Sequence, residues 1–143
     1  MYDLSRFIKA QENEYKIAVS EIKAGGKSSC WMWYIFPQVK GLGNSAISKY
    51  YALDGLGEAK AYLKNKVLKD RLEAICLELL KLKSNDAAEI FGYPDNFKLH
   101  SSMTVFLLAE PGNEVFRAVL DKFFDGKMDL KTQNIIEKEM DTK

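Results

Sequence analysis

Lys98, Ser101 and Ser102 are the residues whose types and spacing come nearest to a catalytic pattern. On a helix, both serines would lie one turn from the lysine, which is the spacing that a Ser–Lys nucleophile pair needs. The sequence shows no oxyanion donors and no group that would orient a base, so a covalent serine mechanism is disfavoured. We favour close helix packing through the two small side chains, with ligand contacts from these three residues as the alternative.

The single histidine and the two cysteines form no metal-binding pattern. His100 has no histidine partner for metal or relay chemistry, and Cys30 and Cys76 lie far apart in the chain without a CxxC pair. We therefore expect no metal, no cofactor and no disulfide framework. His100 is interpreted as a structural or exposed residue of a helix.

An aromatic segment, residues 31–38, places two tryptophans, a tyrosine and a phenylalanine beside a proline and a glutamine. A buried indole needs a partner for its N–H group, and ligand sites are largely apolar with a few convergent polar groups. The segment therefore predicts either a core cluster or a pocket lined by Trp31, Trp33 and Phe36, with Gln38 as a polar contact. Both interpretations stay open.

The next segment, Gly41–Ala46, formally matches the GxGxxA fingerprint of dinucleotide-binding proteins. That fingerprint works after a parallel strand in a βαβ unit, whereas Pro37 argues against a central strand here. We favour a loop that leads into a helix. Its backbone amides near Gly43 and Asn44 would be available to an anion.

Apolar residues recur at steps of three and four between Leu4 and Ile22, which is typical of an amphipathic helix. Gln11 stands on the same apolar stripe, with Tyr15 one turn later. A buried primary amide must find hydrogen-bond partners, so a structural network is the first interpretation of Gln11 and a ligand-facing amide is the second.

Helical periodicity or capping signals continue along the rest of the chain, and the fold class that we predict is all-α. The expected helical segments are 30–36, 46–51, 56–63, 67–82, 87–91, 95–108, 114–124 and 130–136. Propensity is divided between helix and strand in 95–108. Segment 67–82 has a broad apolar face and is expected at the centre of the core. We predict one compact domain, residues 1–136, built as an irregular, orthogonal multi-helix bundle, and a charged, frayed tail, residues 137–143.

Composition limits the classes of partner. The 143 residues suffice for one domain with a core, and 47% hydrophobic and 29% charged residues are typical of soluble globular proteins. No segment approaches the roughly eighteen uninterrupted apolar residues of a spanning helix, and no secretion signal is recognisable, so we expect a cytoplasmic protein without membrane contact. The net charge of +1 disfavours nucleic acid as a partner.

The sequence resembles the family filed as domain of unknown function 1810, some of whose members carry a calpastatin label. The matching segments extend over nearly the whole chain, and the most specific are Trp31–Gln38, Gly41–Gly43, Ile90–Gly92 and Lys98–Phe106. The resemblance implies a compact, mostly α-helical single domain, found chiefly in bacteria, with no established activity. It favours a helix for 95–108.

Cys30 departs from the family pattern, because a histidine usually precedes the first tryptophan there. We therefore assign Cys30 no catalytic role. A fainter similarity connects the chain to proteins that process ADP-ribose and related NAD products, and it adds some weight to a nucleotide-type ligand.

These observations lead to three hypotheses of function. The first is a site for a small anionic, nucleotide-like ligand, with hydrolysis or transfer as the reaction class if the protein is an enzyme. Its residues would be Gln11, Trp31, Trp33, Phe36, Gln38, Gly43, Asn44, Lys98, Ser101 and Ser102. The second is a non-catalytic module that binds a protein partner through an aromatic surface. In the third, these residues only specify the core.

Overall fold

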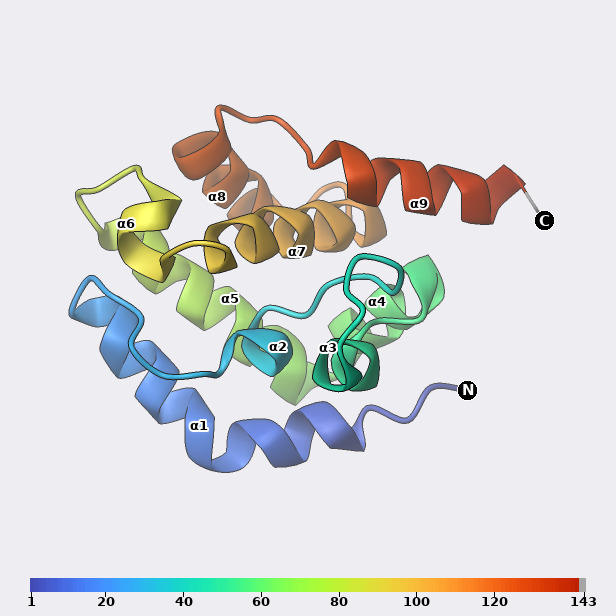
Figure 1. The fold of residues 1–143 in the computed structure, drawn as a ribbon, viewed down its shortest axis with the longest axis horizontal. Helices are drawn as coiled ribbons and strands as arrows, with labels where there is room; N and C mark the ends of the chain where they lie inside the picture. Colours follow the sequence, from blue (N-terminus) through green and yellow to red (C-terminus); the bar gives the residue numbers. More distant parts are fainter. Residues whose placement is uncertain (142–143) are drawn as a thin grey trace.

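A computed structural model describes residues 1–141 of the chain, and that part of the chain is helical without a β-strand (Figure 1). The helices are α1 (Ser5–Lys23), α2 (Met32–Ile35), α3 (Ala46–Tyr51), α4 (Gly55–Lys64), α5 (Lys66–Lys81), α6 (Ala87–Phe91), α7 (Asp95–Ala109), α8 (Glu114–Phe124) and α9 (Leu130–Asp141). The predicted all-α, single-domain fold is confirmed. None of the helices in this range is both long and apolar enough to cross a membrane.

Helix α7 lies at the centre of the fold, where it packs against α4, α6, α8 and α9 (Figure 1). Every residue from Ser101 to Leu107 is buried. A helix that is covered on all sides has no polar face, and its sequence therefore lacks a clear amphipathic pattern. The sequence pattern predicted segment 67–82, rather than α7, at the centre of the core. That segment, as α5, contributes an apolar face against α1, α4 and α8, but α7 occupies the centre.

The aromatic segment folds as the short helix α2, followed by an extended stretch and a loop. The extended stretch makes one isolated bridge, between Val39 and Leu53, where the Leu53 N–H donates to the Gln38 carbonyl over 2.8 Å. The loop ends at Ser45, whose hydroxyl accepts from the Ser48 N–H and caps α3. The GxGxxA match therefore does not follow a strand of a βαβ unit.

Helix α9 continues past the expected domain boundary at residue 136 and reaches Asp141. The Glu139 carboxylate accepts from the Leu56 N–H at the first turn of α4, over 3.2 Å to each oxygen. Residues 137–141 of the expected frayed tail are therefore helical. The contact between Glu139 and the first turn of α4 fastens this end of α9 to the domain. Residues 142 and 143 lie outside the described residues.

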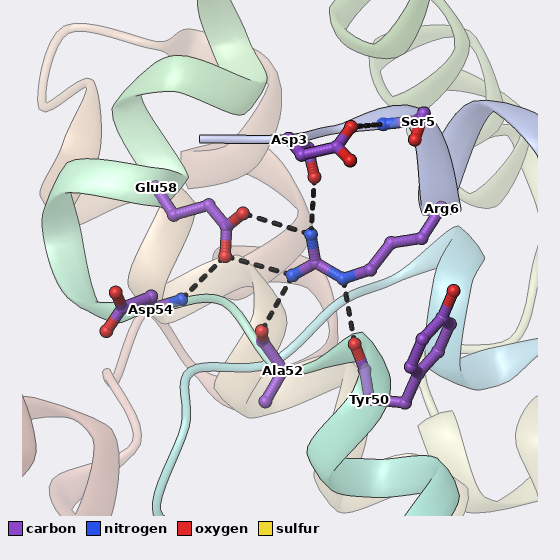
Figure 2. A network of polar contacts seen from close by, with 7 residues as sticks. All are labelled: Asp3, Ser5, Arg6, Tyr50, Ala52, Asp54 and Glu58. Atoms are coloured by element: carbon purple, nitrogen blue, oxygen red, sulfur yellow. Dashed lines mark hydrogen bonds and ion pairs between the residues drawn. The ribbon is translucent and has the colours of Figure 1, made fainter. Parts of the chain in front are cut away.

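Arg6 ties α1 to the segment that contains α3 and the start of α4 (Figure 2). Its guanidinium meets both oxygens of the buried Glu58 carboxylate, at 3.0 and 3.1 Å. It also donates to the backbone carbonyls of Asp3, Tyr50 and Ala52 over 2.8 to 2.9 Å. This network fixes the turn after α3, and that turn forms one wall of the site described below.

Candidate functional site

Two of the predicted ligand-binding aromatics belong to the core. Trp31 and Phe36 are fully buried, and their rings pack against each other and against Phe91. The Trp31 indole N–H donates to the Glu21 carboxylate over 2.9 Å, so the indole has the partner that burial requires. Neither ring borders a hollow that could admit a ligand.

The Glu21 carboxylate organises the loop that leads into this cluster. It accepts from the backbone N–H groups of Ser28 and Ser29, from the Ser29 hydroxyl and from the Trp31 indole. Partial burial would raise the pKa of Glu21, but these hydrogen bonds to its charged form outweigh burial and lower the pKa to about 2. Glu21 therefore has a structural role as an anionic acceptor for the loop.

Gln11 is also part of a closed network. Its side-chain N–H groups donate to the Tyr34 carbonyl over 2.7 Å and to the Tyr62 hydroxyl over 3.1 Å, and its carbonyl accepts from Arg71 over 3.3 Å. Only 1% of Gln11 is exposed. Its amide is satisfied within the protein, which agrees with the structural interpretation rather than the ligand-facing one.

A hollow of about 440 Å³, called the first hollow below, opens between α2, the 39–44 loop and α3. Trp33, Gln38, Gly43 and Asn44 from the predicted set line it. The other lining residues are Val39, Lys40, Gly41, Leu42, Ser48, Lys49, Tyr51 and Ala52. Its size lies within the range of small-molecule sites, roughly 300 to 1,000 Å³.

Gln38 is held in one orientation by α7. The Ser101 hydroxyl lies 3.1 Å from the Phe97 carbonyl and 3.3 Å from the Lys98 carbonyl, and its single proton serves these acceptors. It therefore accepts from the Gln38 side-chain amide, over 2.6 Å. The Gln38 carbonyl Oε1 receives no hydrogen bond within residues 1–141 and remains an acceptor for a ligand.

The first hollow has an uncompensated positive charge. Lys40 and Lys49 are exposed on its rim and form no ion pair with any described residue, and the lining contains no carboxylate. The backbone N–H groups of Gly43 and Asn44 have no acceptor in the described part of the chain. These donors and cations form the side of the hollow that would face an anion.

Lys98 lies behind this site rather than in it. Its ammonium is 2.9 Å from the Asp95 carboxylate and 3.8 Å from the centroid of the Trp33 ring. Lys27 pairs with the other oxygen of Asp95 at 2.7 Å. Burial would raise the pKa of Asp95, but the hydrogen bonds from Lys27 and Lys98 outweigh it and lower that pKa. Lys98 thus packs against the face of the Trp33 ring, and Trp33 borders the first hollow.

The two serines have different positions. Ser101 is engaged with Gln38, whereas the Ser102 hydroxyl is fully buried and has no partner among the described residues. Neither hydroxyl is bonded to the side-chain ammonium of Lys98, which pairs with Asp95, so α7 shows no Ser–Lys nucleophile pair. His100 stacks on Phe124 with 4.0 Å between ring centroids, and its Nε2 is 2.7 Å from the Lys127 carbonyl, which is a structural position.

Comparison with known proteins assigns the chain to a family. A family model described as "Protein of unknown function (DUF1810)" matches residues 1–136. The chain belongs to this family. The DUF1810 assignment confirms the resemblance that the sequence indicated. No match was found among curated proteins.

The fold of this DUF1810 protein is similar to a crystal structure of the conserved hypothetical protein Rv1873 from Mycobacterium tuberculosis. The two chains are 40% identical, the alignment covers 95% of this chain and 97% of that one, and the TM-score is 0.92. This similarity supports the compact all-α domain.

Lys40 and Lys49 were missed in the sequence, although a signal for them exists. No acidic residue occurs between Glu21 and Asp54, while several lysines do. A long segment without carboxylates that contains glycines and aromatics is a local cationic surface, even in a chain of almost zero net charge. The described residues contain no group of three His, Cys, Asp or Glu side chains that could hold a metal ion.

Proposed function

We propose that this DUF1810 protein binds a small anionic molecule with a planar ring, of the nucleotide type, in the first hollow. The observation that carries the proposal is the combination in one concave site of an aromatic wall and two unpaired lysines. Trp33 and Tyr51 supply the wall, and Lys40 and Lys49 supply the charge. The described lining of the first hollow contains these two cations and no carboxylate.

The polar groups of the hollow suit a phosphate ester in particular. Lysine ammonium groups attract phosphate as point charges, and free backbone N–H groups at Gly43 and Asn44 add directed hydrogen bonds. The Gln38 carbonyl accepts from an amino or hydroxyl group of the ligand. The planar part of the ligand would lie beside the indole of Trp33.

The proposal is for binding and does not extend to a reaction. The lining of the first hollow contains no carboxylate and no imidazole that could act as a general base, and its Ser48 hydroxyl donates to the Ser45 carbonyl over 2.8 Å. Hydrolysis or transfer on a nucleotide-like ligand therefore remains a prediction from the sequence without a catalytic group in this hollow.

The interaction-module hypothesis has less support. It needed the aromatic run to form an exposed surface, but Trp31 and Phe36 are buried in the core and Trp33 is covered on one face by Lys98. Trp33 borders the first hollow, and a hollow suits a small molecule better than a protein surface.

The experiment is calorimetric titration of AMP, ADP and inorganic phosphate into the wild-type protein and into Lys49→Glu. We expect AMP or ADP to bind, and we expect the charge reversal to weaken that binding by about tenfold or more, since it turns an attraction to phosphate into a repulsion. Inorganic phosphate should bind more weakly than AMP, because it lacks the ring.

Lys60→Glu is the matched control. Lys60 is exposed on α4, forms no ion pair with a described residue and borders none of the hollows, so the same charge change should leave AMP affinity within about twofold. Absence of binding to the folded wild-type protein, or equal losses in both variants, would contradict the proposed site.

A further inference from the structure

A second hollow, of about 610 Å³, adjoins the first one on the side of α7 and α9. Gln38 and Leu42 line both hollows, so the two are parts of one continuous concave surface with the Gln38 amide between them. The remaining lining residues of the second hollow are Phe97, His100, Ser101, Lys127, Met128, Asp129, Leu130 and Lys131. A ligand in the first hollow could extend past Gln38 without leaving the protein surface.

The second hollow has a strongly apolar wall that is largely exposed in the described chain. The exposed fraction is 56% for Phe97 and 72% for Leu130, the first residue of α9. Phe97 and Leu130 come from different helices, α7 and α9, and Met128 also lines this hollow. Exposed apolar side chains from two helices that line one concave surface are typical of ligand sites.

The charge of the second hollow is also positive. Lys127 and Lys131 are exposed and form no ion pair within residues 1–141. The one carboxylate of the lining, Asp129, already accepts from the N–H and the hydroxyl of Thr132, over 3.1 and 2.7 Å, and caps α9. Its Oδ2 atom is therefore used within the protein, and the two lysines outnumber the one carboxylate, so the lining keeps a net positive charge.

Gln38 is the polar group where the two hollows meet. Its backbone is fixed by the hydrogen bond from Leu53, and its side chain by the bond to Ser101. Its carbonyl Oε1 has no donor among the described residues. A rigid acceptor at this junction would contact the middle of a long ligand, not its ends.

We propose that the natural ligand is a nucleotide conjugate in which a phosphate linkage joins the nucleotide to a second group that carries a planar ring. The nucleotide ring lies by Trp33 in the first hollow, the linking part passes Gln38, and the second group occupies the wall formed by Phe97 and Leu130. Lys49 attracts the phosphate of the nucleotide in the first hollow, and Lys131 attracts the part of the phosphate linkage that lies beyond Gln38. The inference rests on the proposed function, since it assigns the ligand class for that site and its extension.

The test uses AMP as a short probe and NAD, a dinucleotide, as a long probe, with dissociation constants from calorimetry. In the wild-type protein NAD should bind more tightly than AMP. Lys131→Glu should weaken NAD about tenfold and leave AMP within about twofold, because only the long probe reaches the second hollow. Phe97→Ala should weaken NAD in the same selective way, through lost apolar contact rather than charge.

Lys138→Glu supplies the control on the same helix. Lys138 is exposed on α9 and lines neither hollow, so it carries the same charge change without the proposed contact. Circular dichroism of all variants verifies that they are folded.

The outcomes separate the two proposals. AMP binding that depends on Lys49, together with NAD affinity unchanged in Lys131→Glu and Phe97→Ala, would overturn the second subsite and leave the first hollow in place. Failure of both AMP and NAD to bind the wild-type protein would overturn the proposed function and the subsite with it. A loss in Lys138→Glu equal to that in Lys131→Glu would also overturn the subsite.

Discussion

The Arg6 network and the first hollow are both rich in polar groups, but they use those groups in opposite ways. In the Arg6 network every nitrogen of the guanidinium donates, and the Glu58 carboxylate accepts from Arg6 and also from the Asp54 N–H (Figure 2). In the first hollow, Lys40 and Lys49 have no ionic partner within residues 1–141, and the side-chain Oε1 of Gln38 has no donor there.

The difference separates groups that build the fold from groups that are left for a ligand. Removing a satisfied buried group leaves its partners unpaired and lowers stability, whereas removing an unpaired exposed group costs little. The two regions are also connected, because Arg6 binds the backbone of Tyr50 and Ala52 next to residues that line the hollow. The Arg6 network therefore fixes the backbone beside the first hollow.

The largest effect is expected from Arg6→Ala. The substitution leaves the buried Glu58 carboxylate and two backbone carbonyls of the 50–52 turn without their donor, so the free energy of unfolding should fall by about 3 to 5 kcal/mol. Denaturant unfolding of the wild-type protein and the variant measures this loss of free energy. Arg6→Lys should recover only part of the loss, because an ammonium cannot reach both carboxylate oxygens and the carbonyls together. A loss below about 1 kcal/mol for Arg6→Ala would show that the network does not support the fold.

Substitutions of Gln11 and Gln38 test the same comparison between satisfied and free polar groups, with intermediate losses of stability. Gln11→Ala removes a buried amide with three partners and should lower the free energy of unfolding by about 2 to 3 kcal/mol. Gln38→Ala should cost about 1 kcal/mol or less, since it breaks one partly buried bond to Ser101. Nucleotide affinity should show the reverse order, with Gln38→Ala the more damaging. Equal effects of both substitutions on affinity would contradict the distinction.

A third predicted effect, smaller than those of Arg6→Ala and Gln11→Ala, depends on pH. The pKa of Glu21 is lowered from 4.5 to about 2 in the folded protein, so the unfolded chain binds this proton at higher pH than the folded chain does. The stabilisation is present above the unfolded value and is lost as the pH falls from about 4.5 towards about 2. Glu21→Gln should lower the free energy of unfolding by about 1 to 2 kcal/mol near neutral pH, and the difference should shrink in acid.

Glu12→Gln is the control for this measurement, because Glu12 is an exposed residue of the same helix. Denaturant unfolding of the three proteins at neutral and acidic pH gives the comparison. A Glu21→Gln difference that stays constant between the two conditions would show that the hydrogen bonds of the loop do not depend on the charge of Glu21.

The sequence predicted the helices well, because their capping residues and apolar periodicity are local signals. Periodicity could not assign the aromatics, however. Trp31 and Phe36 turn inwards while Trp33 borders a hollow, although all three belong to one short segment. Which ring faces the core depends on where α6 and α7 lie, and that is set by packing between distant segments.

The centre of the fold was missed for a related reason. The broad apolar face of 67–82 is visible in the sequence because the rest of that segment is polar. Helix α7 is covered by four other helices, so Ser101, Ser102 and Thr104 occupy buried positions, where their small side chains permit close approach. The hydroxyls of Ser101 and Thr104 bond to backbone carbonyls of the same helix. A sequence with polar residues on a buried helix shows little contrast between its faces.

Amide NMR spectra of isotope-labelled protein, recorded while AMP is added, test the central claim most directly because they report on both regions at once. The account predicts that the signals of the Gly43 and Asn44 backbone amides, the Trp33 indole and the Gln38 side chain shift with a common saturation curve, while the Arg6 guanidinium signal stays in place. Shifts confined to other surfaces, or no shifts at high AMP concentration, would contradict a ligand site in the first hollow.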